Sequence, residues 1–242
     1  PVVLEGMTPA QAALDYEARL QAAIQKTGKG KADLVVLGIG GAYPLKNELG
    51  RFLGIAGGHI GFNEPGTQPA DRTRVMELTS KTRKDTGFRF KNLKHRSDYD
   101  LAWPTEVPTH AITLGVANIL ESSEILILAN GEEKSLVVEA AHTGEPNPDI
   151  IATYLKHHPD VHWFLDEDAA SRLLHTQAPW LVGPVEWDDD MVRKAVLYTL
   201  KLHPDLRIYQ LQARHLRQAG VPRSVIRKRG GIAAIRDMVT KA

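Results

Sequence analysis

The chain has 242 residues, of which 43% are apolar and 24% are charged, and it contains no cysteine. This composition is typical of a globular protein and excludes a disordered chain, a disulfide scaffold and thiolate zinc sites. The net charge of +1 hides an uneven distribution, because residues 201–242 carry ten basic and two acidic side chains, a net of +8, which leaves −7 for residues 1–200. We therefore expect a main domain followed by a basic appendage.

The sequence shows no targeting signal. It has no apolar run of the length that spans a membrane, about 18 residues, and its first residues lack a basic segment followed by an apolar core. We expect a cytoplasmic protein that does not cross a membrane.

Helical and strand patterns alternate over the first three quarters of the chain. Thr8-Pro9 is a helix-start signal, and apolar spacing then predicts a helix over 9–26. Short continuous apolar runs, typical of buried parallel strands, lie at 33–40, 124–129 and 162–165. Further helical patterns lie at 108–120, 132–142, 147–157 and 166–174.

This alternation predicts an α/β fold, a doubly wound, Rossmann-like parallel sheet core, over residues 1–183. Residues 184–242 lack strand patterns and predict an α-helical, basic C-terminal extension with helices at 188–202, 205–219 and 222–239. In such sheets ligands bind beyond the carboxyl ends of the strands. Here those ends lead into the glycines after Leu37 and into the Asn130-Gly131 turn.

The segment that indicates chemistry is Gly-Gly-His-Ile-Gly-Phe-Asn-Glu-Pro-Gly at 57–66. Its glycines allow the backbone to approach a ligand, and its spacing could place the carboxylate of Glu64 against the ring of His59. Such a pair suits proton transfer on a sugar oxygen. The alternative is a capped turn with a structural histidine.

Residues 33–40 followed by 58–66 resemble the signature of the glucosamine-6-phosphate deaminase/isomerase family, which includes 6-phosphogluconolactonase relatives. The resemblance continues through Asp-Arg-Thr-Arg at 71–74, through 78–79 and 82–83, and across 109–120 into 125–134. Residues 178–187 resemble the longer members of that family. The resemblance implies an aldose–ketose isomerisation of a phosphorylated amino sugar with release of ammonia. We expect no metal and no other cofactor.

The resemblance also implies roles for individual residues. His59 would be the acid/base that opens the sugar ring, and Glu64 would be its orienting partner. Lys134 matches a phosphate-binding lysine, although it could instead be a solvated residue in the first turns of a helix. The full set implied to bind substrate is Gly38, Gly40, Gly58, Asn63 and Lys134.

Three departures from the family pattern stand out. The aspartate expected two residues before the signature histidine is Gly57, and an extra stretch at 41–56 interrupts the signature. The family's amino-terminal half has no counterpart in this sequence. Because an incomplete sheet would expose an apolar edge or face, we expect a homo-oligomer, or a second polypeptide, to cover it.

Two other groups of residues permit alternative functions. His157, His158, Asp160 and His162 could offer metal ligands, but a helix end followed by a strand accounts for them better. The basic residues of 222–231 could bind nucleic acid, yet few aromatic residues accompany them, so a docking surface is favoured and nucleic acid is not expected as a partner.

The sequence therefore predicts a relative of the glucosamine-6-phosphate deaminase/isomerases. The alternative is a non-catalytic sugar-phosphate-binding or assembly module that has lost the catalytic base. Ammonia release would separate the two.

Overall fold

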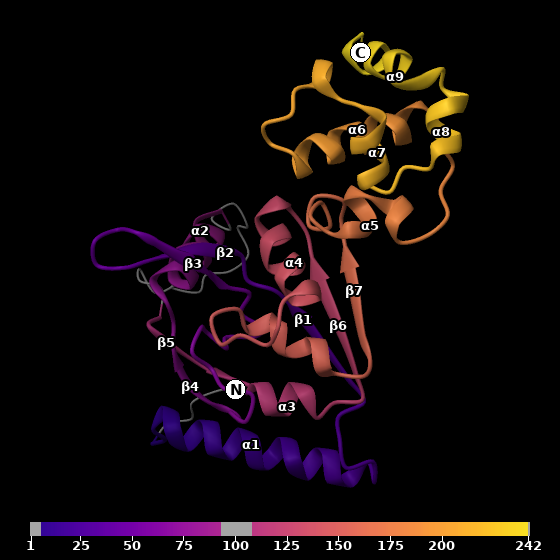
Figure 1. The fold of residues 1–242 in the computed structure, drawn as a ribbon. Coiled ribbons are helices and arrows are strands. Elements are labelled where there is room, and N and C mark those ends of the chain that lie inside the picture. The colour runs from indigo at the N-terminus through magenta and orange to yellow at the C-terminus, as the bar shows by residue number, and fades with distance from the viewer. Residues whose placement is uncertain (1–5, 93–107, 242) are drawn as a thin grey trace. The chain divides into compact units, whose positions relative to one another are not determined.

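The computed structural model describes residues 6–92 and 108–241. The chain forms two compact units, Pro1–Ala170 and Ser171–Ala242 (Figure 1). This division falls before the border expected between residues 183 and 184, so the assignment of 1–183 and 184–242 to two domains stays a prediction. Within the described ranges, no helix has the length and apolar character needed to cross a bilayer.

The core of the N-terminal unit is a three-stranded parallel sheet in the order β1-β6-β7. Its strands are β1 (Leu34–Gly38), β6 (Glu124–Ala129) and β7 (Val161–Leu165). They coincide with the three apolar runs of the sequence, as expected for strands that pair in parallel and bury their side chains. The α/β class and the parallel sheet core are confirmed.

One face of this sheet is packed. Ile125 and Ile127 are fully buried on it, and so are Val137 and Val138 of helix α4 (Ser135–Thr143). The 3-10 helix η3 (Ile151–His157) packs beside α4, and its first five residues are all buried. These two helices supply the layer that covers the sheet on this side.

The opposite face carries apolar side chains that stay exposed. Leu34 and Val36 of β1, Leu128 of β6 and Phe164 of β7 are 45% to 57% exposed. Since side chains alternate along a strand, these residues share the face away from α4. The second helical layer of a doubly wound sheet is therefore missing from this face in the described part of the chain.

A second, antiparallel pair of strands lies beside α1 (Pro9–Lys26), namely β4 (Arg74–Glu77) and β5 (His110–Thr113). The start of α1 at the Thr8 cap confirms the prediction for 9–26. The helix predicted over 108–120 is partly wrong, because its first half is β5 and only α3 (Val116–Leu120) is helical. The pairing of β5 with β4 overrides the local helical spacing.

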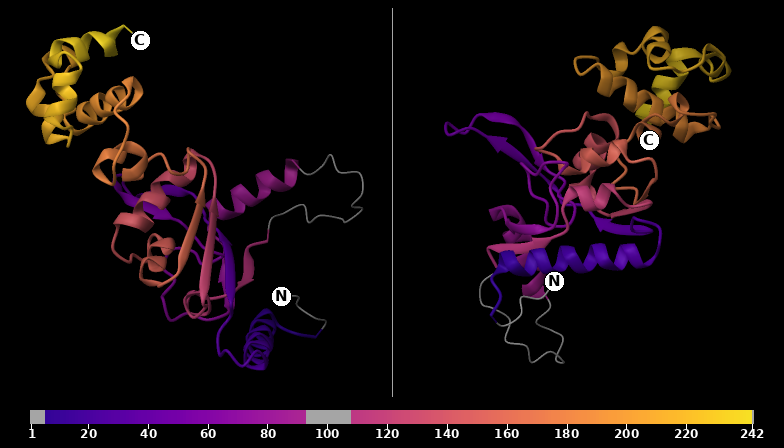
Figure 2. Two further views of the ribbon diagram at one scale, coloured as in Figure 1. Left: turned by 90° about the vertical axis from the view of Figure 1, so that its right-hand side faces the viewer. Right: turned by 90° about the horizontal axis from the view of Figure 1, so that it is seen from below.

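The extra stretch within the signature forms a β-hairpin of β2 (Ala42–Lys46) and β3 (Phe52–Gly57). The hairpin projects from the N-terminal unit (Figure 2). Its second strand leads directly into Gly58 and His59. Helix α2 (Ser80–Asn92), which the sequence did not predict, follows β4.

The C-terminal unit is helical. Its helices are α5 (Leu174–Gln177), η4 (Pro179–Leu181), α6 (Asp189–Leu202), η5 (Ile208–Gln210), α7 (Ala213–Gln218), α8 (Arg223–Lys228) and α9 (Gly231–Thr240). Val196, Leu211, Leu216 and Ile235 form the centre of a separate hydrophobic core. The helical C-terminal region is confirmed, whereas the helix predicted over 166–174 is wrong, since those residues form turns up to the start of α5.

Candidate functional site

A cavity of about 650 Å³ opens in the N-terminal unit at the carboxyl ends of β1 and β6. Parallel α/β sheets place their ligand sites at such strand ends. Four segments line the cavity: the end of β1 and the loop after it, the end of β6 with the turn that follows, the signature segment, and α2. The lining residues are Gly38, Ile39, Gly40, Gly41, His59, Gly61, Phe62, Thr82, Asp85, Thr86, Leu128, Ala129, Asn130 and Lys134.

The imidazole of His59 lies against the backbone of Gly40. The Gly40 N–H donates to the His59 carbonyl oxygen at 2.8 Å. A Cβ atom on Gly40 would stand 2.2 Å from Nδ1 of the His59 ring, which no real side chain tolerates. The glycine after β1 therefore leaves the space that the ring occupies.

Burial lowers the pKa of His59 from its ordinary value of 6.5, because a buried ring holds its charge less readily. The carboxylates of Glu64 and Asp85 act in the opposite direction, while the ammonium groups of Lys134 and Lys81 lower the pKa further. The net shift is downward. Near neutral pH the ring is then uncharged and able to accept a proton.

Glu64 is buried, with 2% of its surface exposed. Its carboxylate accepts hydrogen bonds from the backbone N–H and the hydroxyl of Thr79, both at 3.3 Å. Among the described residues, no hydrogen bond joins Glu64 to the His59 ring, so its carboxylate acts on the ring through charge. An orienting role for Glu64 remains a prediction.

Asn63 and Gly58 shape the segment and do not line the cavity. The Asn63 amide donates to the carbonyl oxygens of Ile60 and Leu114, and its oxygen accepts from Arg74 at 2.9 Å. Gly58 has a φ of +60°, and a Cβ there would approach the Ile150 side chain to 3.1 Å. Both residues hold the loop around His59, and their predicted contacts with substrate are untested.

Lys134 lies at the edge of the cavity directly before α4, and 13% of its side chain is exposed. Its ammonium group is 3.8 Å from a carboxylate oxygen of Glu133. A cation beside the first turn of a helix favours an anion, because the helix N-terminus adds a partial positive charge. Phosphate binding by Lys134 stays a prediction.

The position two residues before His59 cannot carry an acid in this fold. Gly57 has a φ of +128°, and a Cβ there would stand 2.2 Å from the carbonyl oxygen of Gly41. The close approach of Gly41 follows from the hairpin, in which Ala42 pairs with Gly57. The departure at Gly57 and the extra stretch at 41–56 are therefore structurally linked.

The contribution of α2 to this site was not predicted from the sequence. Thr82, Asp85 and Thr86 recur at the spacing that places residues on one face of a helix, and all three line the cavity. That spacing is a signal in the sequence, but only the tertiary structure shows that this face lies near His59.

The candidate metal cluster does not assemble. His158 is buried and its ring nitrogens face the carbonyl oxygens of Asp160 and Ser122, whereas His162 is exposed and pairs with the Asp160 carboxylate at 2.9 Å. Over residues 6–92 and 108–241, His, Asp and Glu side chains do not gather in threes as a metal site would need.

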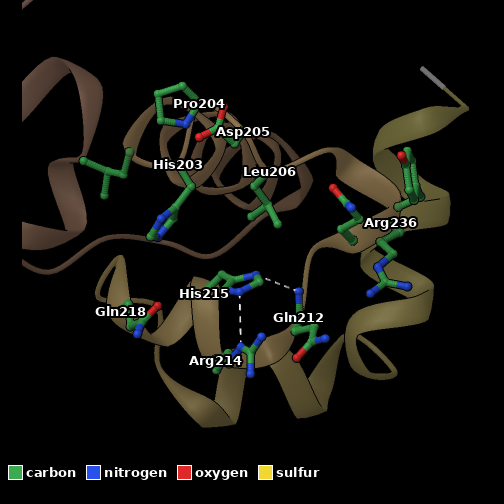
Figure 3. A pocket seen from close by; sticks show the side chains of 12 residues that line it. His203, Pro204, Asp205, Leu206, Gln212, Arg214, His215, Gln218 and Arg236 are labelled. Carbon is green, nitrogen blue, oxygen red and sulfur yellow. Dashed lines mark hydrogen bonds between the residues drawn. The ribbon is translucent and has the colours of Figure 1, made fainter.

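A second cavity, of about 810 Å³, lies within the C-terminal unit (Figure 3). The rings of His203 and His215 face each other there with centroids 5.6 Å apart. His215 Nδ1 accepts from the backbone N–H of Gln212 at 3.1 Å, and the Arg236 guanidinium donates to the Leu211 carbonyl oxygen at 2.8 Å. Because these polar groups already hold the helices together, the cavity around His59 is the better candidate site.

No model of a known protein family matches this chain. A glucosamine-6-phosphate deaminase of Rhodopirellula baltica is 39% identical over 144 residues, which are 60% of this chain and 47% of that protein. A glucosamine-6-phosphate deaminase of Bacillus pumilus is 43% identical over 122 residues, 50% of this chain and 46% of that protein. The chain therefore spans about half the length of these curated relatives.

Among solved structures, a monomeric glucosamine-6-phosphate deaminase is similar, with 31% identity and a TM-score of 0.48, over 66% of this chain and 54% of that one.

Proposed function

We propose that this chain, which is 39% identical to a glucosamine-6-phosphate deaminase over 60% of its length, acts on a phosphorylated amino sugar and converts the aldose to a ketose with release of ammonia. The observation that supports this most directly is the cavity that brings Gly38, Gly40, His59 and Lys134 together at the strand ends. A neutral imidazole suits opening of the sugar ring, and a cation in the same cavity suits binding of a phosphate group.

In this proposal His59 opens the sugar ring. Its uncharged ring takes the proton of the C1 hydroxyl and returns a proton to the ring oxygen, which gives the open-chain aldehyde. Lys134 and the first turn of α4 bind the phosphate and so fix the sugar relative to His59.

The test is to measure ammonia and ketose phosphate formed from glucosamine 6-phosphate. We expect His59→Ala to lose activity by about 100-fold or more, since general acid–base groups contribute about 10² to 10⁴. His157→Ala is the matched control, because His157 is exposed and lies outside the cavity. Equal activity of the two variants would contradict the role of His59.

Lys134→Ala tests phosphate binding separately. We expect it to raise KM for glucosamine 6-phosphate more than it lowers kcat, whereas Lys31→Ala, in an exposed bend, leaves both unchanged. An unchanged KM in Lys134→Ala would remove this residue from the site.

The alternative function is a sugar-phosphate-binding or assembly module without catalysis. The absence of a side chain at Gly57 favours it. In that case glucosamine 6-phosphate raises the melting temperature of the wild-type chain, but neither wild type nor His59→Ala releases ammonia.

We also propose that further polypeptide covers the exposed face of the β1-β6-β7 sheet, either a second copy or a different chain. Apolar side chains from all three strands lie on that face, and a contiguous apolar surface of this kind is typical of an interface. Light scattering after size exclusion tests self-association, with Val36→Asp expected to lower the mass. A stable monomer that stays monodisperse at high concentration would contradict a covering partner.

A cytoplasmic location and the absence of a nucleic-acid partner remain predictions. Retention on heparin measures the latter, and we expect the basic C-terminal helices to give weak retention that moderate salt abolishes.

A further inference from the structure

The cavity of about 810 Å³ in the C-terminal unit contains a histidine that faces more hydrogen-bond donors than it can accept. The backbone N–H of Gln212 donates to Nδ1 of the His215 ring at 3.1 Å, and the Nε–H of Arg214 donates to Nε2 at 3.2 Å (Figure 3). A neutral imidazole has a single acceptor nitrogen, and a protonated ring has none. At least one of these two N–H groups therefore lacks an acceptor at this ring.

Positive groups surround the same ring. The ring of His203 faces it, with centroids 5.6 Å apart. Within residues 6–92 and 108–241, no hydrogen bond joins the two rings or engages the ring of His203 with another residue. Burial lowers the pKa of His215, and the charges of Arg214 and His203 lower it further. Each of these groups therefore disfavours a positive charge on its neighbour.

The chain supplies little negative charge to balance these groups. The one carboxylate among the described lining residues is that of Asp205, which is exposed and forms no ion pair in the parts of the chain that the structure describes. The guanidinium of Arg236 also lines the cavity and donates to the carbonyl oxygen of Leu211, which carries no net charge. The positive charges that line this cavity are thus left for a ligand to neutralise.

The wall opposite α7 is largely apolar. Leu202, Pro204 and Leu206, from the end of α6 and the turn after it, line the cavity there. The volume of about 810 Å³ lies within the range of small-molecule sites, about 300 to 1,000 Å³. The cavity therefore has room for an anionic group that belongs to a larger molecule, whose remaining atoms would contact the apolar wall.

We propose that this cavity binds the phosphate group of a small phosphate monoester through His203, Arg214 and His215. A monoester phosphate carries three strong acceptor oxygens, so it can accept from donors that approach from different sides. In the complex Arg214 donates to the phosphate instead of to His215, through a guanidinium fork that suits phosphate. The His215 ring then carries its proton on Nε2, donates to the phosphate, and keeps Nδ1 as the acceptor for Gln212.

The experiment follows the ring C–H resonances of His203 and His215 by NMR in the full chain while inorganic phosphate is added. These signals report on the C-terminal cavity, so phosphate bound beside Lys134 does not interfere. We expect saturable shifts of both rings. Arg214→Ala should weaken this binding by about 10-fold or more, because hydrogen bonds between charged groups are the stronger ones. Arg217→Ala is the matched control and should leave it unchanged, since Arg217 is exposed on the same helix and lies outside this cavity.

A variant with the opposite expected effect separates a lost ligand contact from a disturbed fold. Asp205→Asn removes the carboxylate from the cavity wall and should strengthen phosphate binding by about two- to fivefold. Because Asp205, Arg214 and Arg217 are all exposed, the three variants should melt at the wild-type temperature without phosphate.

Two other anions test the class of ligand. Acetate presents a planar carboxylate, and dimethyl phosphate has the single charge of a nucleic-acid linkage. Both should bind about 10-fold or more weakly than inorganic phosphate, because each offers fewer charged oxygens.

The outcomes that overturn the proposal are separate from those that test the cavity around His59. The absence of saturable shifts at His203 and His215 overturns it, and so do equal losses in Arg214→Ala and Arg217→Ala. If acetate or dimethyl phosphate binds as tightly as inorganic phosphate, the assignment to a phosphate monoester is wrong. A wild-type chain that releases no ammonia contradicts the proposed function and leaves this site unaffected.

Discussion

The two faces of the β1-β6-β7 sheet are both apolar in sequence, yet their surroundings differ. On one face Ile125 and Ile127 are completely buried beneath α4 and η3. On the other, Val36, Leu128 and Phe164 remain more than half exposed. Strands that are apolar at successive positions are typical of a sheet that is buried on both faces. The described residues of this chain cover only one of the two faces.

The exposure of one sheet face also concerns the candidate site, because the cavity around His59 is lined by residues from both faces of the sheet. Leu128 belongs to the exposed face and lines the cavity, whereas Ala129, the next residue, is buried and lines it too. A polypeptide that covers the exposed face would therefore also contact the wall of the cavity.

The largest difference in unfolding free energy should be between alanine variants of two neighbouring residues of β6. Ile127→Ala removes a fully buried side chain and should cost about 2 to 5 kcal/mol of unfolding free energy. Leu128→Ala, on the opposite face, should cost less than about 1 kcal/mol. Urea unfolding followed by circular dichroism measures both. Similar costs for the two variants would mean that the exposed face is covered in solution.

The next largest difference in stability should be between alanine variants of two glycines, Gly38 at the end of β1 and Gly40 in the loop after it. In Gly40→Ala the new methyl group would overlap the His59 ring, so we expect a loss of about 1 to 3 kcal/mol and a displaced ring. At Gly38 nothing lies within 4 Å of a new Cβ, and Gly38→Ala should change stability by about 0.5 kcal/mol or less. The imidazole resonances of His59 should shift in the first variant and stay near their wild-type positions in the second.

Strands β1, β6 and β7 and helix α1 could be predicted from the sequence because their signals are local: apolar runs, and Thr8-Pro9 as a cap. Strand β5 could not, since its pairing with β4 joins segments more than thirty residues apart. For the site, the signature segment and Lys134 were found by resemblance. Asp85 was missed because its helix reaches the cavity only through tertiary packing.

A third and smaller difference concerns the acidic residues of α1. Burial would raise the pKa of Glu17, but hydrogen bonds from Thr73, Asn118 and Gln21 outweigh it and hold the pKa below its ordinary value. The stability that ionised Glu17 contributes is therefore present above the pKa of the unfolded chain and is lost as the pH falls through the lower pKa of the folded state. Glu17→Gln should cost about 1 to 2 kcal/mol at neutral pH and less in acid.

The matched control for Glu17 is Asp15, whose exposed side chain pairs with Arg19 at 2.9 Å on the same helix. Asp15→Asn should cost less than about 0.5 kcal/mol, because exposed ion pairs contribute little. Urea unfolding at pH 7 and pH 4 measures both variants. Equal pH dependence in Glu17→Gln and wild type would show that the Glu17 network does not stabilise the fold.

The smallest effect is a shift in the titration of His59. Lys134 and Lys81 both lower the pKa of His59, after burial, and the contribution of the more buried Lys134 is the larger. Removing a positive charge favours the protonated ring, so Lys134→Met should raise this pKa, and Lys81→Met should raise it by less. Titration of the imidazole protons by NMR measures both. A larger rise of the His59 pKa in Lys81→Met than in Lys134→Met would mean that charges on α2, where Asp85 also lies, affect this pKa more than the charge beside α4.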